Sequence, residues 1–201
     1  MDKDSFETNP DAYYDRVKTL ITNPQEVLLD NNDCVLTYIA MRSMFEEAIG
    51  DIQMFCRKFH VFQSSFINSI EGDVHYPEEV RRTVILRFQE AVETFLQKGH
   101  NLIAIIDNPG DWEEEEKKDS YFVQLFRQYS SQINLRTPTK KYHDLLGITF
   151  FEMVPTTHNN LGAVRWEAAL NNCHAIVSSS ATMYRNCDKF FQQLKRFSKP
   201  I

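Results

Sequence analysis

The stretch YIAMRSMFEEAIGDIQMFCRKFHVFQSSF, residues 38–66, places large apolar side chains at alternating intervals of three and four residues. The members of this row are Tyr38, Met41, Phe45, Ala48, Ile52, Phe55, Phe59, Phe62 and Phe66. Such spacing is typical of one face of a long α-helix that packs against other helices, as in a coiled coil. It predicts a first long helix over residues 34–70, closed by the glycine of Glu71-Gly72-Asp73.

A second row with similar spacing lies at the other end of the sequence. Its members are Ala169, Cys173, Ile176, Ser180, Met183, Cys187, Phe190, Leu194 and Phe197. It predicts a final helix from about residue 159 to Phe197. Between the two rows, apolar periodicity predicts a long helix over residues 77–106 and another from Asp111 to about Ile133.

Two shorter segments complete the expected elements. Asn9-Pro10 combines an N-cap with proline at the first helical position, which predicts a short helix ending near Asn23-Pro24. Residues 138–155 stay open, because the segment has a helical pattern while Ile148-Thr149-Phe150-Phe151 equally suits a β-strand.

These elements predict an all-α fold: an elongated antiparallel helical bundle of about five helices, three or four of them long. A 35-residue helix spans roughly 52 Å, whereas a compact chain of this length is about 43 Å across. The bundle is therefore expected to be elongated unless Gly50 breaks the first helix. Residues 1–33 are expected to form a polar N-terminal segment with a short helix, and residues 34–201 a single helical-bundle domain.

Composition narrows the class of protein. The formal net charge of −6 argues against a nucleic-acid partner, and no apolar run approaches the roughly twenty residues of a membrane span. The first ten residues have no apolar signal region. Four cysteines without a CxxC pair indicate buried reduced thiols and a cytoplasmic protein, with a disulfide or metal site as the alternative.

One dipeptide suggests catalysis. All-helical phosphohydrolases of the HD superfamily bind metals through a His, a His-Asp pair and a later Asp, and His100, His143-Asp144 and Asp188 occur in that order. The pair follows a polar helix start rather than the apolar run expected before buried ligands. An HD-type metal-dependent phosphohydrolase is therefore the weaker alternative.

Other catalytic and metal sites find no support in the sequence. On the predicted final helix, Cys173 and Cys187 would be roughly 21 Å apart, too far to share a zinc ion. No phosphate-binding glycine loop, nucleophile elbow or zinc-protease string is present. The sequence therefore predicts a protein that is not an enzyme, with no catalytic residue, metal or cofactor.

A small basic cluster near the end of the sequence is the candidate binding site for an anionic partner. It consists of Lys189, Lys195, Arg196 and Lys199. The same cations would stabilise the C-terminal end of a helix through its dipole alone. Arg81-Arg82 and Lys140-Lys141 would extend the cluster if the fold brought them together.

The resulting prediction is a non-catalytic cytosolic helical module for protein interaction or scaffolding. Its expected partner is another protein or a second copy of the chain, with no nucleic acid and no small-molecule substrate. The main alternative is a peripheral membrane-binding, BAR-like dimer, which rests on long helices alone.

Overall fold

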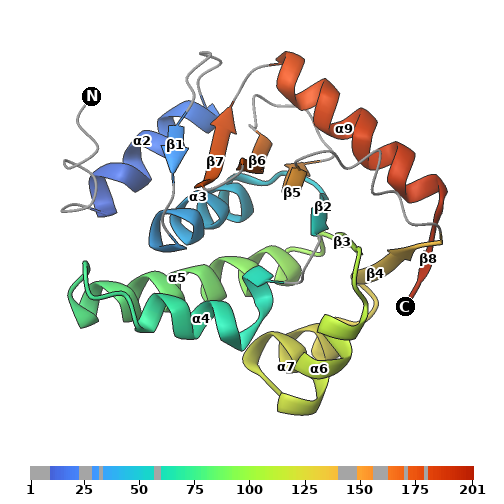
Figure 1. Cartoon of the computed structure of the whole chain (residues 1–201), viewed down its shortest axis with the longest axis horizontal. Coiled ribbons are helices and arrows are strands. Elements are labelled where there is room, and N and C mark those ends of the chain that lie inside the picture. The colour runs from blue at the N-terminus through green and yellow to red at the C-terminus, as the bar shows by residue number, and fades with distance from the viewer. Residues whose placement is uncertain are drawn as a thin grey trace.

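The computed structural model describes residues 10–22, 29–31, 34–56, 60–139, 149–155, 163–169, 172–178 and 181–201. Over these residues, helices and one eight-stranded sheet form an α/β structure (Figure 1). The helices are α2 (Pro10–Thr22), α3 (Cys34–Glu47), α4 (Ser64–Glu71), α5 (Glu78–Gln97), α6 (Gly110–Lys118), α7 (Tyr121–Gln128) and α9 (Ala181–Arg196), with a 3-10 turn at His60–Phe62. The strands are β1 (Leu29–Asn31), β2 (Ile52–Cys56), β3 (Leu102–Ile106), β4 (Ile133–Pro138), β5 (Thr149–Pro155), β6 (Ala163–Ala169), β7 (Asn172–Ser178) and β8 (Ser198–Pro200).

The strand order is β1-β7-β6-β5-β2-β3-β4-β8. Strands β2, β3 and β4 are parallel, with Ile52 opposite Leu102 and Leu102 opposite Ile133, and the other neighbours pair antiparallel. All five residues of β2 are buried, and β3 reads Leu-Ile-Ala-Ile-Ile. Central parallel strands are covered on both faces, which explains the apolar run of β3 and the complete burial of β2, Gln53 included.

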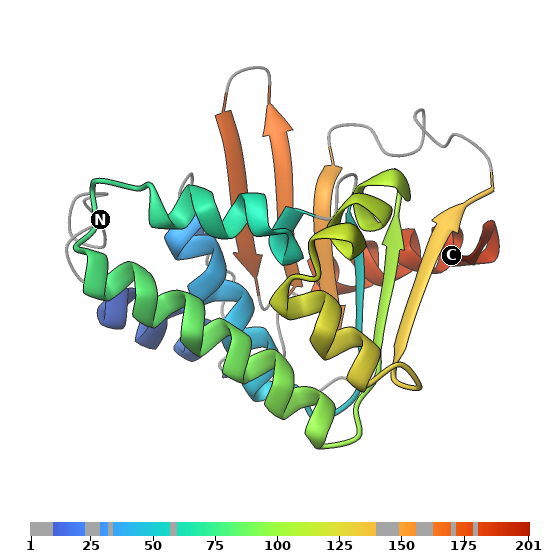
Figure 2. The same cartoon turned by 90° about the horizontal axis from the view of Figure 1, so that it is seen from below.

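The two faces of the sheet carry unequal layers (Figure 2). Ile52, Met54 and Cys56 of β2 belong to the main core together with buried residues of α2 to α7. Phe55 points to the other face, where it joins a smaller cluster with Ile105 and residues of α9. Among the described elements, α9 is the helix that covers this second face.

The predicted first long helix is wrong, because the row that suggested it crosses four elements: α3, β2, the 3-10 turn and α4. Helix α3 ends at Glu47, and the Gly50-Asp51 bend leads directly into β2. The Asp51 carboxylate then accepts the Asn101 N–H at 2.8 Å, which joins the starts of β2 and β3. The row continues through the 3-10 turn to Phe66 of α4, whereas Phe59 lies outside the described residues.

The next two predicted helices are shorter than expected. Helix α5 starts beside Pro77 as predicted but ends at Gln97, because Gly99 takes a left-handed conformation with φ 85° before β3 begins. The helix expected from Asp111 to about Ile133 divides into α6 and α7 at Asp119, whose φ is 49°. Ile133 is the first residue of β4.

The C-terminal third also departs from the predicted helix. The second apolar row begins in β6, passes through β7 and enters α9 at residue 181. In the open segment 138–155, the strand interpretation is correct for residues 149–155, which form β5. The short N-terminal helix is observed as α2.

The all-α prediction, with its elongated bundle and coiled-coil packing, is therefore wrong. Strands buried on both faces lack the polar alternation that distinguishes a strand from a helix in sequence. Within the described part of the chain, no helix is both long and apolar enough to cross a lipid bilayer.

Candidate functional site

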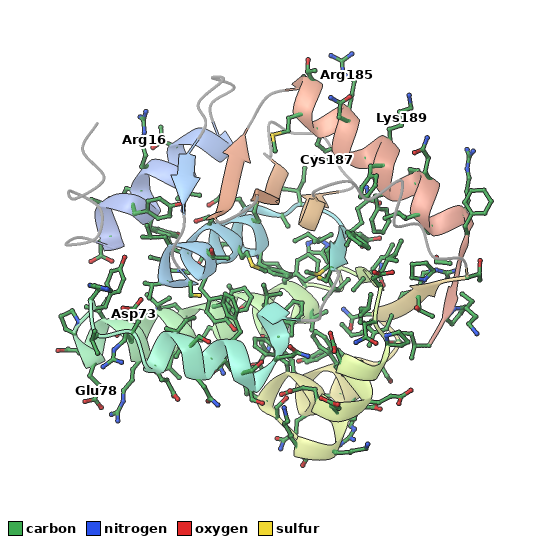
Figure 3. The ribbon with its side chains drawn as sticks, in the orientation of Figure 1. Arg16, Asp73, Glu78, Arg185, Cys187 and Lys189 are labelled. Atoms are coloured by element: carbon green, nitrogen blue, oxygen red, sulfur yellow. The ribbon has the colours of Figure 1, made fainter. Side chains whose placement is uncertain are left out.

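The outer side of α9 carries a row of cations. Arg185, Lys189 and Arg196 are exposed and lie four and seven residues apart, which places them on one side of the helix. At 1.5 Å per residue, the row is about 16 Å long. Figure 3 shows Arg185 and Lys189 pointing from α9 away from the sheet. With half-buried Lys195 and exposed Lys199 of β8, these five residues are called the α9 cations below.

Among the described side chains, no carboxylate pairs with the α9 cations. On α5, the exposed Arg82 forms an ion pair with Glu78 at 2.6 Å. Arg127 of α7 forms an ion pair with Asp119 at the same distance. In contrast, none of the α9 cations forms an ion pair with a side chain that the structure describes. Arg185 Nε donates only to a backbone group, the carbonyl of Ala181, at 3.0 Å. The row thus presents net positive charge to solvent.

The helix dipole accounts for only part of this charge. Lys195 and Arg196 lie in the last turn of α9, where cations are stabilised by the helix C-terminus. Arg185 and Lys189 lie outside that turn, and two like charges four residues apart cost a helix about 0.2–0.5 kcal/mol. Their placement is therefore not explained by the stability of α9.

The inner side of α9 holds the helix on the sheet. Phe191 and Leu194 are buried against Phe55 of β2 and Ile105 of β3. This apolar contact leaves the cationic side facing outward.

A polar contact anchors the middle of the helix. Buried Gln53 of β2 donates through Nε2 to Oδ1 of Asp188 at 2.5 Å. Gln192 Nε2 donates to the same Oδ1 and to Gln53 Oε1, each at 3.2 Å. The carboxylate of Asp188 is thus held toward the sheet instead of neutralising the cations beside it.

Tyr184 adds no opposing charge to this region. Burial, followed by the nearby carboxylate of Asp188, raises the pKa of Tyr184 above its ordinary value. Its hydroxyl therefore stays neutral at physiological pH. Beside it, the side chain of Cys187 is buried (Figure 3).

The residues considered for an HD-type metal site do not form one in the described structure. The ring of His100 lies 5.3 Å from that of Phe95, and Asp188 belongs to the network with Gln53. His143-Asp144 lies outside the described residues. Among the residues that are described, no three His, Cys, Asp or Glu side chains gather as metal ligands.

The predicted placement of Cys173 and Cys187 on one helix is also wrong. Cys173 lies in β7 and Cys187 in α9, so the distance along one helix does not apply to them. Burial raises the pKa of the Cys56 thiol, so that it stays protonated.

The expected extensions of the basic cluster do not join it. Arg81 and Arg82 belong to α5, which packs on the opposite face of the sheet from α9. Lys140-Lys141 lies outside the described residues. Arg185, in contrast, belongs to the row and was missed. Its position four residues before Lys189 was the available signal, but it required the correct start of α9.

No protein-family model matches the chain, and no curated protein matches it. A phospholipase D family member, Nuc from Salmonella typhimurium, has a similar structure at a TM-score of 0.53 and 11% identity, over 89% of this chain and 99% of that one. TrmBL2, described as an archaeal chromatin protein with a novel mode of DNA binding, is similar at 0.53 and 9%, over 99% of this chain and 64% of that one. These likenesses show the fold.

They also overturn the functional prediction. The non-catalytic helical scaffold, the BAR-like dimer and the HD-type enzyme all presuppose a helical bundle. The chain instead shares its fold with a phospholipase D family member. The prediction that it is not an enzyme is therefore wrong, because it was made for a helical bundle. The prediction that the chain has no nucleic-acid partner conflicts with its structural likeness to TrmBL2, which is described as binding DNA.

Proposed function

We propose that the chain binds the phosphodiester backbone of a nucleic acid through the α9 cations. The observation that carries this proposal is the outward row formed by Arg185, Lys189 and Arg196, without a carboxylate partner among the described side chains. Lysine and arginine side chains that replace the counterions of a phosphate backbone supply most non-specific nucleic-acid affinity.

The net charge of the whole chain does not oppose this proposal. Residues 181–201 contain five Lys and Arg and one Asp, a net of +4 in a chain of net −6. Acidic side chains such as Asp73, in the connection between α4 and α5, and Glu78 of α5 lie away from Arg185 and Lys189 (Figure 3). Local potential, more than total charge, steers a phosphate polymer toward one surface.

The likeness to TrmBL2 supports the same proposal. The described DNA binding belongs to that protein, of which this chain spans 64%. The two share a fold over 99% of this chain, so a fold of this kind is compatible with DNA binding. Cys56, whose side chain is a buried thiol, supports a reducing compartment, as in the cytoplasm.

The test is fluorescence anisotropy with a labelled 30-nucleotide DNA at 50 mM salt, in single-stranded and duplex form. The double variant Arg185→Ala/Lys189→Ala is expected to bind at least about tenfold more weakly, because two phosphate contacts are lost. A tenfold loss of affinity corresponds to about 1.4 kcal/mol of binding free energy. The matched control is Arg82→Ala/Arg87→Ala, which removes two exposed cations from α5. Equal losses in both double variants, or no binding by the wild type, would contradict the proposal.

A further inference from the structure

An exposed aromatic ring stands at the end of the cationic helix. Phe197 is 48% exposed and follows directly on exposed Arg196, with exposed Lys199 two residues further. Two aromatic side chains of α9, Tyr184 and Phe191, are buried. Phe197, in contrast, is not a member of the buried apolar clusters that the described residues form.

The backbone that carries this ring is fixed on both sides. The Phe197 N–H donates to the Leu194 carbonyl at 3.1 Å, and its own carbonyl accepts the N–H and hydroxyl of Thr139 at 2.7 and 2.6 Å. Arg136 of β4 then donates from Nε to Ser198 Oγ at 2.8 Å and from Nη2 to the Ser198 carbonyl at 2.7 Å. A ligand therefore meets an ordered backbone and loses little affinity to ordering it.

We infer that the α9 surface binds single-stranded nucleic acid, with an unpaired base stacked on Phe197 and its flanking phosphates on Arg196 and Lys199. Proteins that bind single strands combine a cationic track with aromatic rings on which bases stack. In a duplex each base is already stacked and paired, so the ring has no free base face to contact. The inference rests on the proposed function and adds the strandedness of the ligand.

The same residues fit a lipid surface less well. A helix that lies in a bilayer interface turns a broad apolar side toward the lipid. The outward side of α9 is polar along its length, with Arg185, Lys189, Gln192 and Arg196 exposed, while its apolar side packs on the sheet. A single exposed ring beside a polar cationic row matches a polymer with alternating phosphates and bases.

The experiment compares a labelled oligo-dT 20-mer with a 20-base-pair duplex in anisotropy titrations at fixed salt. Phe197→Leu keeps an apolar side chain but removes the aromatic face, and is expected to weaken single-strand binding about 5- to 150-fold. Duplex affinity is expected to change less than about twofold. Phe197→Trp should bind the single strand as well as the wild type, and Leu86→Ala is the control for an exposed apolar side chain on α5.

Two outcomes overturn the inference and leave the proposed function in place: single-strand binding unchanged in Phe197→Leu, or an equal loss for both DNA forms. Absence of binding to either DNA by the wild type overturns the proposed function as well. A third measurement tests binding of the wild type and Phe197→Leu to vesicles that contain phosphatidylserine. Vesicle binding that depends on Phe197, without DNA binding, would replace the inference with a lipid ligand.

Discussion

At the scale of single residues, Glu115 shows what a charge pattern alone leaves open. The run Glu113 to Glu116 predicts acidic side chains near the start of a helix, and Glu113 does lie in the first turn of α6. Glu115, however, is fully buried and accepts the N–H of Ser64 at 2.9 Å and its hydroxyl at 3.2 Å. It thus serves the first turn of α4, 51 residues earlier, and no local pattern contains that partner.

We expect Glu115→Gln to destabilise the protein by about 1–3 kcal/mol at pH 7, because a buried charge-assisted hydrogen bond is weakened. Burial alone would raise the pKa of Glu115, but the hydrogen bonds from Ser64, Ser120 and Lys118 lower it below its ordinary value. The ionised form therefore favours folding. This contribution is complete above the ordinary pKa of about 4.3 and is lost as pH falls through the lower folded value.

Urea denaturation of the wild type and Glu115→Gln at pH 7 and pH 3 measures this effect. The difference between the two proteins should shrink at pH 3. Glu113→Gln, exposed on the same helix, is the control and should be near neutral. An equal difference at both pH values would show that the charge of Glu115 has no part in stability.

At the scale of elements, a helix or strand was predicted correctly where residues close in sequence determine its structure. The proline-led start of α2 and the start of α5 were predictable, since capping and proline act within one turn. Strand β2 was not, because Ile52 and Phe55 fit a helical row as well as they fit a strand buried on both faces. The cations at the end of α9 were visible in sequence. Their outward orientation depended on Gln53 and Phe55, more than 130 residues away.

Helix α9 is held by a small cluster, which makes its own stability testable. Truncating Phe191, which is 1% exposed against Phe55 and Ile105, is expected to cost about 3–5 kcal/mol. Because elements with few buried apolar contacts open first, peptides of α9 should lose amide protection in Phe191→Ala before those of α5. Hydrogen exchange with mass spectrometry gives the readout. Uniform loss across α5 and α9 would mean that the helix does not open separately.

At the scale of the whole molecule, the sheet explains why the sequence was misinterpreted. Eight strands of three to seven residues pair in an order far from their order in the chain, with β5 next to β2 and β8 next to β4. Such pairings depend on long-range contacts, which periodicity within one segment does not report. The same topology places α9 on the face opposite α3 to α7 and so brings its positive charge to that face. The division of the chain at residue 33 stays a prediction.

The most direct test of phosphate-backbone binding by the α9 cations is the salt dependence of DNA binding. Five phosphate contacts made by the α9 cations predict a slope of about −3.5 for the logarithm of the single-strand association constant against that of salt concentration. In Arg185→Ala/Lys189→Ala the slope should shrink to about −2.1, because two contacts are lost. A slope near zero in the wild type, or an unchanged slope in this variant, would contradict binding of a phosphate backbone by α9.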